Sequence, residues 1–214
     1  MALNKLSYEE QQTLLRDIEK RSPIDALLYR GWILNLNYTI NRLLIESDED
    51  TQEMLTAIFW IRTQGLLTEI SSHYRKVYDN FDYGLKSGKI DPNNTLLILI
   101  ARIYNLLEKI KKSLNEEEII IIDYLRQTHC HVIQKGYQFD IQGNTLKTTY
   151  TFKVINKALH LDQIDEIIST YHRRYFRNNR IDYVSMAKDI ALKIKDDIFQ
   201  LNELFGVLNT PFSN

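Results

Sequence analysis

The side chains that could do chemistry are concentrated in one short stretch, which holds Arg126, Gln127, His129 and His131, with Cys130 between the histidines. Arginine is a permanent cation whose planar donor fork suits a phosphate group. Histidine is the side chain most easily poised to move a proton near neutral pH. An arginine and a histidine together can therefore cleave a phosphodiester without a metal ion, since one stabilises charge and the other transfers a proton.

These residues must be positioned by a helix that we expect over about residues 115–133, with an asparagine cap and acidic residues in its first turn. The helix begins with the apolar run Ile119–Ile122. Successive helical residues rotate by about 100°, so this run cannot face one stripe alone. The helix is either central in a bundle or buries a second face against another copy of the protein. The same rotation points His129 inward, places Arg126 near the edge of the apolar stripe and turns His131 away from its centre.

A purely structural interpretation of this stretch stays open. His129 would then be a core histidine with satisfied hydrogen bonds. Arg126 and His131 would be ordinary surface residues near the C-terminus of a helix, where the helix dipole favours cations.

The pattern of Arg126, a polar Gln127, three residues and His131, late on a helix in a helical protein, resembles the HEPN superfamily (the higher eukaryotes and prokaryotes nucleotide-binding domain). The resemblance extends over about residues 29–133. It implies a bundle of helices that dimerises through the motif-bearing region, so that two motifs meet in one cleft. It also implies a metal-independent endoribonuclease of a toxin–antitoxin or antiphage-defence system, with RNA as substrate and an antitoxin or another defence component as partner.

The resemblance assigns roles to these residues. His131 would act as general base on a ribose 2′-hydroxyl or as acid toward the leaving 5′-oxygen, and Arg126 would neutralise charge on the phosphorus, with Gln127 and His129 in support. The expected product is a 2′,3′-cyclic phosphate. Residues five apart on one helix are separated by about 140°, so a composite site across a two-fold axis would be needed to bring the arginine and the histidine together.

The chain departs from the family pattern in three ways. Asn, Asp or His is more usual than Gln127 after the arginine, and Ile133 stands where the subfamily paired with minimal nucleotidyltransferases has a tyrosine. The core fold also does not require a β-hairpin. Inactive HEPN domains exist, so a catalytically inactive helical regulator that binds RNA or protein remains the alternative function.

A second cluster, from Tyr171 to Arg180, combines cations with aromatic rings. Arginine grips phosphates and aromatic faces stack bases, so this segment is a candidate surface for single-stranded RNA. The candidate RNA-binding residues are Arg173, Arg174, Tyr175, Arg177 and Arg180. The alternative is a solvated helix end whose rings face the core. His73–Lys76 is a smaller patch of the same kind.

Composition sets the broad class. The chain has 214 residues, of which 44% are apolar and 26% charged, as in ordinary globular proteins. A net charge of −1 gives no overall attraction to nucleic acid, and a single cysteine allows no internal disulfide. We find no signal peptide, apolar membrane span, metal-ligand spacing or glycine-rich phosphate loop. We therefore expect a cytoplasmic protein with no metal, no cofactor and no membrane partner.

The apolar periodicity predicts one all-α domain over residues 1–214, a bundle of about six or seven helices. A short helix is expected from Ser7 to Lys20, and a second from Ser22-Pro23. A third, with a bend at Gly65, follows the acidic residues 47–50. A fourth spans about residues 95–113, and helical pattern returns near 161 and again over 182–208. The second helix is expected to bury Leu27, Leu28, Trp32, Ile33, Leu36, Ile40, Leu43 and Leu44. Alternating residues around Gly143-Asn144 predict one inserted β-hairpin at about 136–156.

Overall fold

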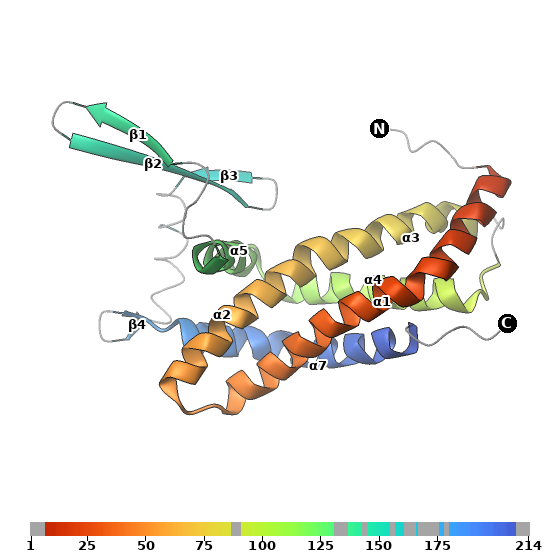
Figure 1. Ribbon diagram of the computed structural model, residues 1–214, viewed down its shortest axis with the longest axis horizontal. Coiled ribbons are helices and arrows are strands. Elements are labelled where there is room, and N and C mark those ends of the chain that lie inside the picture. Colours follow the sequence, from red (N-terminus) through yellow and green to blue (C-terminus); the bar gives the residue numbers. More distant parts are fainter. Residues whose placement is uncertain are drawn as a thin grey trace. The chain divides into compact units, whose positions relative to one another are not determined.

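The structure is a computed structural model that describes residues 7–86, 91–130, 137–142, 145–154, 157–160, 166, 176–177 and 180–208. This part of the chain is mainly helical, as the sequence predicts, and it contains six α-helices (Figure 1). They are α1 (Tyr8–Ile45), α2 (Glu49–Gly65), α3 (Ser71–Lys86), α4 (Thr95–Ser113), α5 (Glu116–Cys130) and α7 (Tyr183–Leu208). Within the described ranges, no helix combines the length and apolar character that a membrane crossing needs.

Helix α1 corrects one prediction about the N-terminal region. The sequence predicts two helices that meet at Ser22-Pro23, whereas the structure has one continuous helix through both residues. An internal proline removes a single backbone hydrogen bond and introduces a local clash. Leu15 before the proline and Ala26 after it are both buried, so tertiary packing holds the helix on each side of Pro23.

The transition from α2 to α3 is a short π-helical turn, Leu66–Ile70, that begins directly after Gly65. The sequence predicts a bend in one helix at this glycine. The Oγ of Ser71 donates a buried hydrogen bond of 2.8 Å to the carbonyl oxygen of Leu66. This side chain gives the first carbonyl of the wider turn a partner where the regular helical hydrogen-bond pattern changes.

The chain divides into two compact units. The first comprises Met1–Asn37, Leu66–Lys112 and Lys195–Asn214, and the second comprises Tyr38–Gly65 and Ser113–Ile194. Helices α1 and α7 therefore contribute residues to both units.

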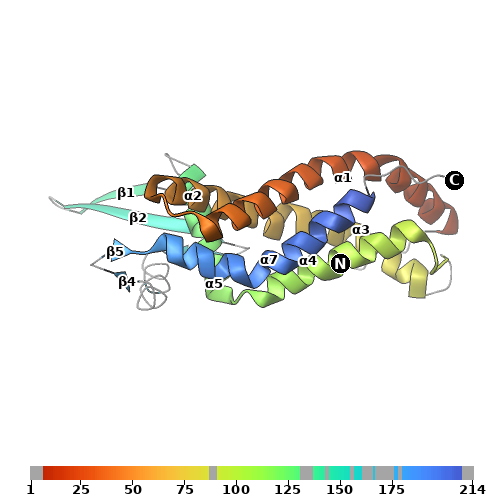
Figure 2. The ribbon, with the colours of Figure 1, turned by 90° about the horizontal axis from the view of Figure 1, so that it is seen from below.

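The first unit packs the N-terminal part of α1, helices α3 and α4, and the C-terminal part of α7 around aromatic side chains. The ring of Tyr74 lies edge-on to Phe205 at 5.4 Å between centroids and to Tyr29 at 6.1 Å. An ion pair joins α4 to α7, with 2.6 Å between Lys109 Nζ and Asp197 Oδ1. Figure 2 shows these two helices running beside each other.

The second unit is organised around α5, which packs against α2 (Figure 1). Ile121 and Ile122 of α5 are buried. The start of α5 is fixed by a reciprocal cap, because Glu118 N donates to Asn115 Oδ1 at 2.8 Å and Asn115 N donates to Glu118 Oε2 at 3.0 Å. Lys193 of α7 also donates to Oε1 of Glu118, which is 2% exposed. This carboxylate therefore anchors both the start of α5 and the α7 side of the unit.

The strands of the second unit form two antiparallel sheets. The first has the order β1 (Tyr137–Gln142), β2 (Thr145–Val154), β3 (Lys157–His160), and Tyr137 pairs with Tyr150. Strands β1 and β2 lie within the segment for which the sequence predicts a hairpin, and its expected turn, Gly143-Asn144, lies outside the described residues. The second sheet pairs β4 (Phe176–Arg177) with β5 (Arg180–Ile181).

Burial along α1 corrects the predicted core of that helix. Ile33, Leu36, Ile40 and Leu43 are fully buried, as expected. Leu27 and Leu28 are not, since 59% and 68% of their surfaces are exposed. The α1 helix carries apolar residues on opposite sides, and spacing alone assigns these two leucines to the wrong one.

Candidate functional site

Arg126 lies in the last part of α5, half-buried at the edge of a largely buried helix. Its neighbour Leu125 is 3% exposed, and Asp123, one turn earlier, is 6% exposed. Gln64 of α2 donates from Nε2 to Oδ1 of Asp123 at 3.2 Å. Residues three apart on a helix are neighbours, so Arg126 and Asp123 share one side of α5. The burial places the guanidinium where its charge is less screened than at an open surface.

The other residues of the motif are described less completely. Gln127 and His129 belong to the backbone of α5, but their side chains lie outside the described part of the chain. The helix is described as far as Cys130, and His131, the next residue, lies outside the described residues. The structure therefore locates Arg126, whereas its proximity to His131 stays a prediction.

The apolar run at the start of α5 is buried within the single chain. Ile120, Ile121 and Ile122 are 9%, 1% and 0% exposed, and Ile119 is half-buried. Of the two alternatives that the sequence leaves open, the central position in the bundle accounts for this burial. The run therefore offers no free apolar face to a second copy of the protein.

The second predicted cluster is only partly described. Arg173, Arg174 and Tyr175 lie outside the described residues. Arg177 of β4 and Arg180 of β5 are paired positions in the short antiparallel ladder. The backbone thus brings two of the predicted cationic positions directly opposite each other in the β4–β5 ladder.

The sequence predicts His73–Lys76 only as a small patch for RNA, whereas in the structure Tyr74 is 3% exposed and His73 contacts side chains of α1 in the first unit. His73 Nε2 lies 3.9 Å from Asp25 Oδ2, and the His73 ring lies 5.2 Å from the rings of both Tyr29 and Tyr74. The side chains of His73 and Asp25 are 35% and 38% exposed. Asp25 and Tyr29 are one turn apart on α1, a spacing visible in the sequence, but their meeting with α3 is a tertiary contact that spacing does not encode.

Burial favours the uncharged forms of His73 and Tyr29 in this cluster. Burial lowers the pKa of His73, and Lys76 lowers it further, while the Asp25 carboxylate acts in the opposite direction. Burial raises the pKa of Tyr29, with smaller contributions in the same direction from Asp25 and Glu69. At neutral pH the cluster therefore presents a neutral imidazole beside a phenol, which can donate and accept hydrogen bonds.

Among the described residues, no three His, Cys, Asp or Glu side chains are grouped so as to hold a metal ion. Comparison of the chain with known protein families, characterised proteins and solved structures finds no match. The function is therefore inferred from the chemistry of the residues themselves.

Proposed function

We propose that the protein is a metal-independent endoribonuclease of a toxin or antiphage-defence type, in which Arg126 and His131 act in a composite site between two copies of the chain. The observation that carries this proposal is the half-buried position of Arg126 beside Leu125 and Asp123, on a helix whose preceding turns are buried. A cation at the edge of a core stabilises developing negative charge more strongly than one in bulk water.

The proposed reaction is an internal transesterification of RNA. His131 removes the proton from a ribose 2′-hydroxyl, and the 2′-oxygen then forms a bond to the adjacent phosphorus. The bond from phosphorus to the 5′-oxygen breaks, and that oxygen takes a proton from His131 of the partner subunit. Arg126 binds the phosphoryl oxygens, on which negative charge grows in the transition state. The products are a 2′,3′-cyclic phosphate and a 5′-hydroxyl end.

The remaining motif residues have supporting roles in this proposal. The hydrogen bond from Gln64 fixes Asp123, and Asp123 lies one helical turn from the arginine. Gln127 and His129 would complete the polar surroundings of the phosphate. Arg177 and Arg180, which pair across the β4–β5 ladder, would contact the RNA backbone away from the scissile bond.

The test is cleavage of single-stranded RNA and tRNA by the purified protein in the presence of EDTA. Removing one preorganised charge-stabilising donor typically costs about 10²–10³-fold in rate, so Arg126→Ala should lose at least this much with an unchanged circular dichroism spectrum. Arg102→Ala, at an exposed arginine of α4, is the matched control and should retain full activity. Mass spectrometry of the 3′ ends should find cyclic phosphate.

Three results would refute the ribonuclease proposal. They are an inactive wild-type protein, equal activity of wild type, Arg126→Ala and His131→Ala, and loss of activity on chelation. The first would favour the second candidate function, a catalytically inactive helical binding module. The specific observation in favour of that candidate is the amount of apolar surface that α1 exposes.

A further inference from the structure

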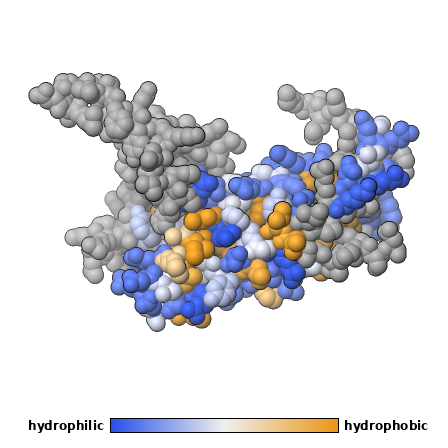
Figure 3. All heavy atoms as spheres, viewed as in Figure 1, coloured by the Kyte–Doolittle hydropathy of each residue, from blue (hydrophilic) through white to orange (hydrophobic). Residues whose placement is uncertain are grey.

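Helix α1 exposes an unusual amount of apolar surface on the side opposite the core. Leu27 is 59% exposed, Leu34 51%, Tyr38 62% and Ile45 74%. A surface helix of a globular protein normally carries polar and charged residues on its outer side. Apolar side chains that gather on one face of a soluble protein usually mark a binding surface. Figure 3 shows apolar side chains among polar ones on the face where α1 lies in front.

The exposed residues follow the spacing of a coiled-coil seam. Steps of four and three residues alternate along one continuous helix, from Leu27 to Ile45. We call these positions the α1 seam: Leu27, Gly31, Leu34, Tyr38, Asn41 and Ile45, all of them exposed. This is the a and d pattern of a heptad repeat, and it covers about 27 Å of helix. The buried residues of α1 lie on the other side of the same helix, so the seam is a second apolar face.

The seam is complementary to itself when two copies run antiparallel. A two-fold axis near Leu36 places Leu27 opposite Ile45, and the same axis places Leu34 opposite Tyr38. It also places the small Gly31 opposite Asn41. Each layer then joins a large residue to a large one, or a small residue to a polar one. A parallel pair in register would instead place two glycines together and leave a gap.

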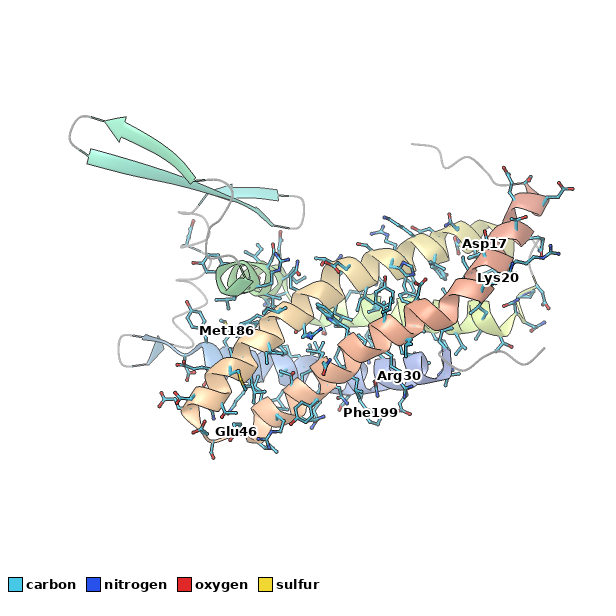
Figure 4. The ribbon with its side chains drawn as sticks, in the orientation of Figure 1. Asp17, Lys20, Arg30, Glu46, Met186 and Phe199 are labelled. Atoms are coloured by element: carbon cyan, nitrogen blue, oxygen red, sulfur yellow. The ribbon has the colours of Figure 1, made fainter. Side chains whose placement is uncertain are left out.

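The charges beside the seam do not oppose this arrangement. Arg42 is already paired with Glu46, with 2.7 Å between Nη2 and Oε2. Arg30 lies toward α7, where its guanidinium would be 3.7 Å from a Cβ on Gly206 (Figure 4). No Asp, Glu, Lys or Arg occupies a seam position. The seam is therefore an uncharged strip of mainly apolar residues, and its flanking cations are directed elsewhere or neutralised.

The exposed area is of the size that association requires. The large apolar residues of the seam offer on the order of 500 Å² per copy, against the roughly 800 Å² per partner in a stable dimer. The polar residues beside the seam can supply the remainder. We propose that the α1 seam is an interface at which two copies of this chain associate as an antiparallel helix pair. This surface is separate from α5 and does not depend on ribonuclease activity.

The first experiment measures the mass of the full chain by sedimentation equilibrium over a range of concentrations. The wild type should associate with itself, and Leu34→Glu should lose the part of this association that the seam provides, seen as a lower mass at the same concentration and an unchanged circular dichroism spectrum. Ile98→Glu, at a residue of α4 that is 45% exposed, is the matched control and should dimerise like the wild type. A wild-type monomer at all concentrations would overturn the proposal. So would a Leu34→Glu variant that associates as strongly as the wild type, because the seam would then contribute nothing to the contact.

The second experiment tests the orientation with disulfide cross-links in a Cys130→Ser background. Leu27→Cys and Ile45→Cys proteins are oxidised alone and as a mixture. The antiparallel pair predicts a disulfide-linked dimer in the mixture and little in either protein alone, because only residues 27 and 45 face each other. Efficient cross-linking of each protein to itself would overturn the antiparallel arrangement. Neither result requires RNA cleavage, so failure of the ribonuclease proposal would leave this test unaffected.

Discussion

Removing a buried hydroxyl from α2 is expected to make the protein more stable. Thr63 is 0% exposed and Thr56 is 3% exposed, and neither Oγ1 has a hydrogen-bond partner among the described residues. Trp60 lies between them on the same buried side of α2, and its indole Nε1 also has no hydrogen-bond partner among the described residues. A buried polar atom without a partner has lost its bonds to water and gained none in exchange.

The expected gain follows from these burials. Burying a hydroxyl without a hydrogen bond costs about 1–3 kcal/mol in proteins, and valine has nearly the shape of threonine. Helix propensities of the two residues are similar, so backbone effects should nearly cancel. Thr63→Val should therefore raise the free energy of unfolding by about 1–2 kcal/mol, with a rise in Tm of about 2–8 °C. Thr56 lies about 10 Å away along the helix, so Thr56→Val should add a similar increment independently.

Urea denaturation followed by circular dichroism at 222 nm measures this change. Ser71→Ala is the matched control, because Ser71 is 8% exposed and its hydroxyl donates to Leu66 O at 2.8 Å. Deleting that bonded hydroxyl should lower the free energy of unfolding by about 1 kcal/mol. If Thr63→Val destabilises the protein as Ser71→Ala does, its hydroxyl has a partner and the reasoning fails.

Three further predictions concern a glycine, an ion pair and a histidine. Gly31→Ala should raise the free energy of unfolding by about 0.5–1 kcal/mol, because nothing lies within 4 Å of an added Cβ and alanine favours the helix. A lower free energy of unfolding for this variant, measured by urea denaturation at concentrations where the protein is monomeric, would contradict this prediction. Lys109→Met should lower the free energy of unfolding by about 1–2 kcal/mol, because Asp197, with a side chain 8% exposed, loses its partner at 2.6 Å. The control is Lys86→Met, in an exposed pair with Asp82, which should change the free energy of unfolding little. Burial holds the pKa of His73 below its usual 6.5, so the free energy of unfolding should fall as the pH drops below about 6.5 through the folded pKa. His73→Gln should therefore weaken the dependence of Tm on pH between about pH 7 and 5, and an unchanged dependence would show that His73 does not contribute.

Local signals in the sequence predict the ends of several helices. Ser7 and Glu10 exchange hydrogen bonds as a capping box, with 2.7 Å from Ser7 N to Glu10 Oε2. Asn115 caps α5 as expected, and α4 spans the predicted residues. These features need only neighbours along the chain. The predicted break at Pro23 fails because packing on both sides of the proline determines whether the helix continues.

Contacts between distant residues are where prediction from the sequence stops. The spacing of Arg126 on its helix predicts a position at the edge of the apolar stripe, and the structure gives a half-buried residue there. The hydrogen bond from Gln64 to the nearby Asp123 joins two helices, and no spacing within either helix encodes it.

Helix α1 shows the same limit in another form. Leu36 lies three residues after Ile33 and is 0% exposed. Leu34 lies four residues before Tyr38, an equally regular step, and is 51% exposed. An apolar periodicity identifies an apolar face of a helix but does not identify the element that packs against that face. When a helix carries two such faces, only the packing of the remaining chain decides which becomes core. The other apolar face stays exposed and can bind a partner whose apolar residues have the same spacing. A second copy of α1 has this spacing because its sequence is identical.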